Sequence, residues 1–273
     1  ACRAVLDAAQ CTIEEREEYE PHLAAGNVVY AGVDYAQIVM RAEQEADVIL
    51  WDGGNNDFPF LSPDLHIVLV DPLRPGNEDS HHPGEAVLRM ADVIVVAKVN
   101  SASDSSVQQV TEAARAINAT APIVRAMSRV TAENPELIRG KRVLVIEDGP
   151  SVTHGGMSYG AGYVAAVAAQ AAEIVDPRAD ALGEIADVYA QYPHIGTVLP
   201  AVGYHPSQLE ALRATINAVG ADLVVVATPC DLSALIVIDQ PVVRVRYEFA
   251  EVGEPGLGSL VEDFLSRRDF LQA

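Results

Sequence analysis

Short apolar runs rich in Val and Ile recur along the chain and alternate with segments of helical periodicity. Runs of this kind are typical of buried strands, and we expect strands at Val48–Trp51, His66–Val70, Val93–Ala97, Pro122–Arg125, Val143–Ile146, Glu173–Val175, Val198–Pro200, Leu223–Ala227 and Val242–Tyr247. Helical patterns lie at Ala1–Gln10, Tyr35–Glu45, Ser105–Ile117, Gly162–Ala172, Gly183–Gln191, Pro206–Val219 and Leu257–Arg267. The alternation predicts a three-layer α/β fold with mainly parallel sheets and helices on both faces.

A change of loop style near Ile138–Lys141 suggests a domain boundary. The sequence "PELIRGKR" closes one set of strands and helices, and "VLVIEDGP" begins another. We therefore divide the chain into residues 1–140 and 141–273. A chain of 273 residues, 49% of them hydrophobic, is long enough to build two such cores.

Composition narrows the function classes. The formal net charge of −21 argues against non-specific binding to nucleic acid and against docking on anionic membranes. No apolar run is long enough to span a membrane, and no signal peptide opens the chain. Three cysteines without CxxC spacing argue against a disulfide framework or a zinc site. A cytoplasmic location is therefore expected, and a homo-oligomer is left open.

Two features of the N-terminal region add expectations. The chain begins at Ala1 inside a helical pattern, which suggests a processed protein or a fragment. The charge-dense run Glu14–Glu20 predicts a solvated helix face.

Acidic residues follow two predicted strands of the first half. In "ADVILWDGGNND", Asp52 ends an apolar run and glycines follow. An Asp in this position can hold Mg²⁺ through water, or it can cap a turn. Asp71 follows the next strand, and Arg74 in its loop could reach a phosphate or lie on the surface.

Lys98 ends a third strand in "ADVIVVAKVN", where a nucleotide base-side loop is expected. Ala97 and Asn100 replace the Asn and Asp of the N-K-x-D sequence that reads guanine. The chain has two lysines, Lys98 and Lys141, and neither lies in a G-x-x-x-x-G-K-[ST] phosphate loop. If the first half is an NTPase, the loop that holds its triphosphate lies outside these 273 residues.

The second half contains a glycine-rich loop between Asp148 and an Ala-rich helix. A helix that begins behind such a loop points N–H groups at an anion, so the segment predicts a phosphate- or carboxylate-binding loop. Thr153 and His154 supply side-chain donors, and His154 is a candidate general base. A dinucleotide fingerprint at 160–165 is disfavoured because it does not directly follow its strand.

Arg244 and Arg246 alternate along one predicted strand, so their side chains point the same way. The pair could clamp a phosphate, or each arginine could pair with an acid on the face of an edge strand.

Several long strings resemble the cyclic 2,3-diphosphoglycerate synthetase family of archaea and bacteria, whose bacterial members are often labelled GTPases. The resemblance extends over essentially the whole chain. The strings that carry it are Cys11–Pro21, Ala25–Tyr35, Ala46–Phe60, Asp64–Gly76, Leu137–Pro150, Thr153–Ala166, Tyr192–Tyr204 and Val243–Glu248.

The resemblance implies a fold and a reaction. Residues 1–140 would be the C-terminal part of a phosphate-loop NTPase-like domain, and residues 141–273 an α/β domain for substrate or interface. The family uses ATP and Mg²⁺ to close an intramolecular phosphoanhydride in 2,3-bisphosphoglycerate. Asp52 would face the Mg²⁺, and this chain alone would be inactive without its phosphate loop.

By the same resemblance, the loop after the strand of the second half would serve the substrate or a domain interface. The residues concerned are Glu147, Asp148, Thr153, His154, Gly155 and Gly156. The expected partner is a small phosphorylated metabolite.

Two alternatives stay open from the residues. One is a regulatory NTPase that hydrolyses GTP or ATP without ligase activity, and the other is a module that binds a phosphorylated metabolite. Phosphate release without any change in bisphosphoglycerate would favour the first, and binding without nucleotide would favour the second. A first half without its central strand is also expected to expose apolar edges.

Overall fold

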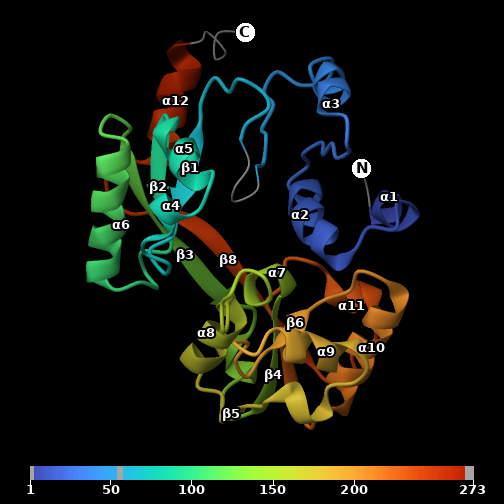
Figure 1. Ribbon diagram of the computed structural model, residues 1–273. Helices are drawn as coiled ribbons and strands as arrows, with labels where there is room; N and C mark the ends of the chain where they lie inside the picture. The colour runs from blue at the N-terminus through green and yellow to red at the C-terminus, as the bar shows by residue number, and fades with distance from the viewer. Residues whose placement is uncertain (1–2, 54–57, 268–273) are drawn as a thin grey trace. The chain divides into compact units, whose positions relative to one another are not determined.

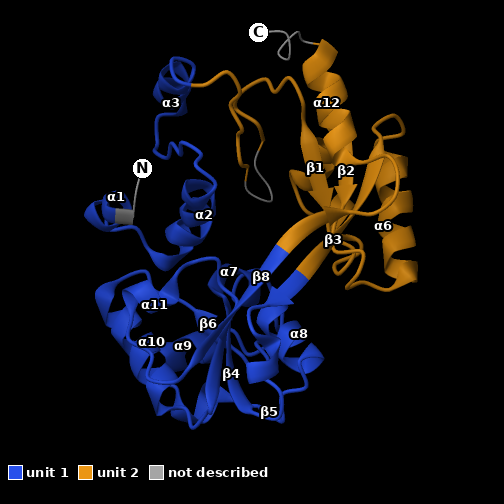
Figure 2. Ribbon diagram, turned by 180° about the vertical axis from the view of Figure 1, so that it is seen from behind, with its two compact units in different colours: residues 1–45, 130–247 blue, residues 46–129, 248–273 orange. Residues whose placement is uncertain are grey.

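The computed structural model describes residues 3–53 and 58–267 (Figure 1). The chain forms two compact units, one of residues 1–45 and 130–247 and one of residues 46–129 and 248–273 (Figure 2). Each unit therefore combines two separate stretches of sequence and does not follow the single boundary drawn near residue 140. The strands β3 (Ile123–Ala132) and β8 (Val242–Glu251) contribute residues to both units.

Unit 1 contains the second half of the sequence and the N-terminal helices. Its helices are α1 (Arg3–Ala8), α2 (Ile13–Ala24), α3 (Tyr35–Ala42), α7 (Gly149–Val152), α8 (Ala161–Ala168), α9 (Glu184–Gln191), α10 (Pro206–Ala218) and α11 (Leu232–Leu235), with 3-10 turns at Pro135–Leu137 and Pro177–Asp180. Its strands, besides the ends of β3 and β8, are β4 (Arg142–Asp148), β5 (Glu173–Ile174), β6 (Leu199–Ala201) and β7 (Leu223–Val226).

The strand β4 lies at the centre of unit 1. It pairs in parallel with β7, which pairs in parallel with β8, and its other edge takes β5 at the start and β6 at the end. The residues 143–146 of β4 are buried completely, although successive side chains point to opposite faces. The sheet is therefore covered on both faces, as the continuous apolar runs predicted.

The helix α2 begins where a capping box fixes its first turn. Thr12 and Glu15 each bond the other's backbone N–H. Ile13 is buried in the core of unit 1. The predicted solvated face of Glu14–Glu20 holds for Glu15 and Glu18, which are exposed, and fails for Arg16 and Glu17, which are only 4% and 8% exposed.

Unit 2 is a smaller parallel sheet in which β2 lies between β1 and β3. The elements of unit 2, besides β3 and β8, are β1 (Ile67–Val70), α4 (Asn77–Ser80), α5 (Gly84–Arg89), β2 (Val93–Val96), α6 (Asp104–Ile117) and α12 (Leu257–Arg267). One face of β2 packs against Leu88, Val107 and Val110, and the other packs towards Leu257 and Leu260.

The strand predicted at Val48–Trp51 is wrong. Its residues have no ladder partner in the described part of the chain, and Val48 and Leu50 are 53% and 81% exposed. An apolar run becomes a strand only where a neighbour satisfies its backbone groups. The rest of the motif, residues 54–57, lies outside the described residues.

The coarse prediction of an α/β fold with mainly parallel sheets is confirmed, since β2 pairs in parallel with β1 and β3, β4 with β5, β6 and β7, and β7 with β8. Over residues 3–53 and 58–267, no helix combines the length and the apolar character that crossing a membrane requires.

Candidate functional site

The carboxyl ends of the unit 1 strands gather polar residues beneath α2. β4 ends at Glu147 and Asp148, and Thr228 follows β7. The helix α2 is fixed over these strand ends by its backbone and side chains. The N–H of Ile13 donates to the carbonyl of Gly203 at 3.3 Å, and Glu20 accepts the N–H of Asp231 at 2.9 Å. Ligands of open parallel sheets bind at this edge, so we take it as the candidate site.

Glu147 binds the glycine-rich loop to the end of β4. Its carboxylate is 1% exposed and accepts the backbone N–H groups of Gly160, Gly162 and Tyr163 at 3.0, 3.0 and 2.8 Å. These groups belong to the first turn of α8. The carboxylate of Glu147 thus occupies the amino end of α8, where an anion was expected to bind. Burial raises the pKa of Glu147, and the three N–H groups oppose that rise.

Other parts of the chain pack closely against the backbone of this loop, which explains two of its glycines. A Cβ at Gly160 would lie 2.7 Å from Oε2 of Glu147, and one at Gly162 would lie 2.8 Å from Cγ1 of Val145. Both distances are shorter than real Cβ contacts allow. The side chains of Glu147 and Val145 therefore occupy the space beside these two glycines.

Glu17 reaches from α2 into the strand ends and forms hydrogen bonds with Asp148 and Thr228. The hydroxyl of Thr228 donates to Oε1 of Glu17 and accepts the N–H of Cys230 at 3.1 Å. Ser151 donates its hydroxyl to Oδ2 of Asp148 at 3.1 Å. The other oxygen, Oδ1, is buried and receives no hydrogen bond from any N–H or hydroxyl group of the described residues.

The charges at this place are almost all negative. Burial, the charge of Asp148 and the hydrogen bond with it raise the pKa of Glu17 to about 9. Burial also raises the pKa of Asp148, against the hydrogen bonds from Ser151 and Glu17 that lower it. One proton between two carboxyl groups satisfies both, so at neutral pH Glu17 holds it and donates to Asp148.

Two tyrosines form the more exposed part of the site. Tyr204 is 46% exposed and donates its hydroxyl to Oε2 of Glu14 at 2.6 Å. Tyr247 is 45% exposed, and burial of its hydroxyl together with the charges of Asp148 and Glu17 raises its pKa. Neither tyrosine therefore ionises at neutral pH.

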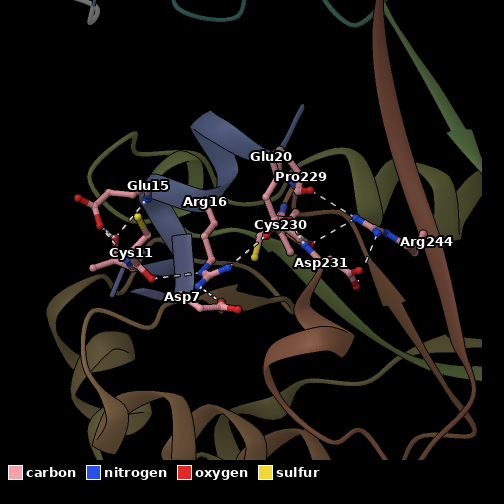
Figure 3. Close-up of polar contacts among 11 residues, drawn as sticks. Asp7, Cys11, Glu15, Arg16, Glu20, Pro229, Cys230, Asp231 and Arg244 are labelled. Carbon is pink, nitrogen blue, oxygen red and sulfur yellow. Dashed lines mark hydrogen bonds and ion pairs between the residues drawn. The ribbon is translucent and has the colours of Figure 1, made fainter. Parts of the chain in front are cut away.

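Arg16, the neighbour of Glu17 in α2, has polar partners of its own. Its guanidinium bonds Asp7 at 2.6 Å and the carbonyl of Cys11 at 3.2 Å, and it lies 3.5 Å from Glu20 (Figure 3). A buried arginine therefore joins α1 to α2.

The two arginines of β8 are paired with acids. Arg244 approaches the carbonyls of Pro229 and Cys230 at 3.4 and 3.3 Å and lies 3.8 Å from Asp231 (Figure 3). Arg246 forms an ion pair with Glu133 at 2.9 Å. This is the pairing that the sequence left open as an alternative to a phosphate clamp.

The remaining predicted residues of unit 1 lie in the turn after β4. Thr153 is buried and donates to the carbonyl of Gly149 at 2.8 Å. Gly155 and Gly156 close tight backbone turns, and Gly156 has a positive φ of 72°. His154 is exposed beside them, with its Nδ1 3.4 Å from the Thr153 hydroxyl. Binding of a ligand by these residues stays a prediction.

In unit 2, three predicted residues meet at one carboxylate. Asp71 accepts from Nζ of Lys98 at 2.9 Å and from Nη2 of Arg74 at 3.0 Å. Burial would raise the pKa of Asp71, but the hydrogen bond and charge of Lys98 outweigh it and lower the value. Asp52 is exposed and lies outside any strand.

Within the described residues, no group of three or more His, Cys, Asp or Glu side chains is arranged to hold a metal ion.

The residue that sequence reasoning missed is Glu17. Its signal is the spacing of Ile13, Glu17 and Glu20, which places the three on one face of a helix. That face carries one apolar residue and two acids, so hydrophobic periodicity did not reveal it.

Comparison with known proteins gives one curated relative and no match to a family model. The chain is 53% identical over 259 residues to a protein of Thermococcus kodakarensis named arginine synthetase ArcE. The match covers 95% of this chain and 58% of the Thermococcus protein, so the chain spans less than two thirds of its relative.

This relative corrects the sequence analysis. The predicted resemblance to the cyclic 2,3-diphosphoglycerate synthetase family was wrong, and so was the predicted cyclisation of 2,3-bisphosphoglycerate with its two alternatives. What the chain resembles over 95% of its length is a protein named for the synthesis of arginine.

Proposed function

We propose that this chain is part of an enzyme that synthesises arginine, with ATP as the source of energy. The observation that carries the proposal is the 53% identity to arginine synthetase ArcE over 259 residues. Because the chain covers 58% of that protein, the complete reaction is proposed for the longer protein rather than for these residues alone.

We assign the cationic side chain of arginine to the strand ends of unit 1. Asp148 and Glu14 offer carboxylates there, and Tyr204 and Tyr247 are 46% and 45% exposed beside them. A guanidinium group binds carboxylates through paired hydrogen bonds and stacks on aromatic faces. The net charge of −21 would further attract a cation.

The proposal also includes ATP and Mg²⁺, although the described residues fit these two groups less well than they fit a guanidinium. Lys98 and Arg74 could approach a nucleotide, but both already neutralise Asp71. Mg²⁺ usually takes one or two carboxylates besides phosphate and water, and Asp52 is one exposed candidate. We therefore derive no step through either group. The finer assignment of the first half to a phosphate-loop NTPase-like domain stays part of this proposal for residues 46–129, since residues 1–45 and 130–140 belong to unit 1.

The test uses a chimera in which this chain replaces the matching 259 residues of the Thermococcus protein. The reverse reaction is followed as ATP formed from arginine with either ADP and phosphate or AMP and diphosphate. We expect arginine-dependent ATP, reduced at least tenfold (~1.4 kcal/mol) by Asp148→Asn and unchanged by Glu210→Gln at an exposed site. An inactive chimera beside an active Thermococcus protein would contradict the proposal.

A further inference from the structure

Two carboxyl groups hydrogen-bond each other between α2 and β4. Glu17 and Asp148 are the partners, and Glu17 is 8% exposed. Two ionised carboxylates are both acceptors and cannot form such a bond, so one of them carries a proton. Glu17 is the more deeply buried of the two, and Asp148 is stabilised in its charged form by hydrogen bonds from the hydroxyl and the backbone N–H of Ser151. The proton therefore sits on Glu17 and points to Asp148.

The charges that act most strongly on Glu17 are those of the acids Asp148 and Glu14. The basic side chains of the neighbouring elements have acids of their own, since Arg16 of α2 is engaged by Asp7 and Glu20, and Arg244 of β8 lies 3.8 Å from Asp231 (Figure 3). The titratable groups that face the pair are Glu14 of α2, Glu147 of β4, Tyr204 after β6, Cys230 after β7 and Tyr247 of β8. An ionised Glu17 would therefore be repelled by Asp148, with the hydrogen bond from Thr228 as its main compensation.

Glu17 lies in the middle of the contacts that fix α2. Ile13 and the Glu14–Tyr204 bond lie one turn before it, and the bond of Glu20 to the N–H of Asp231 lies one turn after it. Separation of α2 from the strand ends would expose Glu17 to water, where it would ionise like an ordinary glutamic acid. Opening of α2 and loss of this proton are thus one event.

We propose that α2 is a proton-controlled cover over the carboxyl ends of β4 and β7, which stays closed while Glu17 keeps its proton and opens to expose Asp148 when the proton is lost. This inference concerns the chain without any ligand and does not depend on the proposed synthesis of arginine.

The pKa of Glu17 sets how strongly the opening of α2 depends on pH. Closed α2 holds one proton up to about pH 9, while open α2 releases it above the ordinary value of 4.5. Between those limits each pH unit favours the open form by a factor of about ten. The closed form is therefore most stable in mild acid.

Hydrogen exchange of the α2 amides from pH 6 to pH 9 tests this, with protection factors used so that the intrinsic pH dependence of exchange cancels. We expect protection to fall about tenfold per pH unit in the natural chain and in the control Glu18→Gln, an exposed neighbour on the same helix. Glu17→Gln keeps both hydrogen bonds without a proton to lose, so its protection should be independent of pH.

Protection that does not change with pH in the natural chain would overturn the proposal, as would an equal slope in Glu17→Gln. Asp148→Asn gives a second test, because Asn can donate to an ionised Glu17. Its slope should shrink, and an unchanged slope in that variant would also overturn the proposal.

Discussion

Two aspartates mark the ends of parallel strands, one in each unit, and their surroundings are opposite. Asp71 follows β1 and receives hydrogen bonds from Lys98 and Arg74, which lower its pKa. Asp148 ends β4 and faces another carboxyl group, and its pKa is raised. The same strand-end pattern in the sequence thus leads to a neutralised ion pair in unit 2 and to a shared proton in unit 1.

The difference arises from what the rest of the chain brings to each strand end. In unit 2 the loop after the neighbouring strand supplies Lys98. In unit 1 the amino end of α8 supplies N–H groups, but Glu147 accepts all three of them. These three N–H groups stabilise Glu147 rather than Asp148, and α2 adds Glu17 rather than a base. A strand-end acid therefore has no fixed chemistry until its distant partners are known.

The largest predicted effect is on the pH dependence of stability. Because the pKa of Glu17 is raised to about 9 in the folded chain, its stabilising contribution is complete below pH 4.5 and decreases as pH rises towards 9. The free energy of unfolding should fall by about 1.4 kcal/mol per pH unit in this range. Glu17→Gln should remove that slope in urea titrations. An identical slope in the variant would mean that Glu17 carries no proton in the folded chain and that the contrast between Asp71 and Asp148 is wrong.

Removal of Glu147 should have the next largest effect. Glu147→Ala leaves three backbone N–H groups buried without an acceptor and should cost about 3–5 kcal/mol of the free energy of unfolding. The matched control is Glu210→Ala, which removes an exposed acid paired with Arg213. Equal denaturation midpoints for the two variants would contradict the anchoring role of Glu147.

Gly162→Ala should have an intermediate effect. The added Cβ would lie 2.8 Å from Val145 and 2.9 Å from Ala227, so α8 must move away from the sheet. We expect a loss of about 1–3 kcal/mol. Gly220→Ala is the control, since its Cβ would meet nothing within 4 Å. The comparison is made by thermal unfolding, and a loss as small as that of the control would count against this packing.

The smallest effect is expected in unit 2. Lys98→Met removes one partner of Asp71, and because Lys98 is 32% exposed the cost should be about 1 kcal/mol or less at neutral pH. The lowered pKa of Asp71 gives stability above 3.8 that is lost as pH falls through the lowered value. Acid unfolding of the variant should therefore differ less from that of the natural chain than neutral unfolding does. If the variant and the natural chain differed more in acid than at neutral pH, the lowered pKa of Asp71 would be contradicted.

Sequence patterns predicted the strands and helices well where local periodicity decides the structure. The predicted strands other than Val48–Trp51 all match a strand of the structure, and the predicted helices all match a helix. The exception failed because a strand also needs a paired neighbour. The glycines at 160 and 162 indicated a close approach, but the sequence could not say that the approaching groups are Glu147 and Val145.

The candidate site was predicted only in part. Glu147 and Asp148 were identified from their place at a strand end, and both lie in the acidic site. Glu17 was missed because a run of acids on a helix usually faces water. Its burial depends on contacts with residues far along the chain, namely Asp148 and Thr228, which no local pattern encodes.

The protonation of Glu17 tests this account most directly. The ¹³C chemical shift of its side-chain carboxyl can be followed by NMR from pH 4 to pH 10, with Glu17→Gln used to assign the signal. The account predicts a titration midpoint near 9, well above that of an ordinary glutamic acid. A midpoint near 4.5 would mean that an ionised Glu17 faces Asp148 without a shared proton, and the proposed cover would be contradicted.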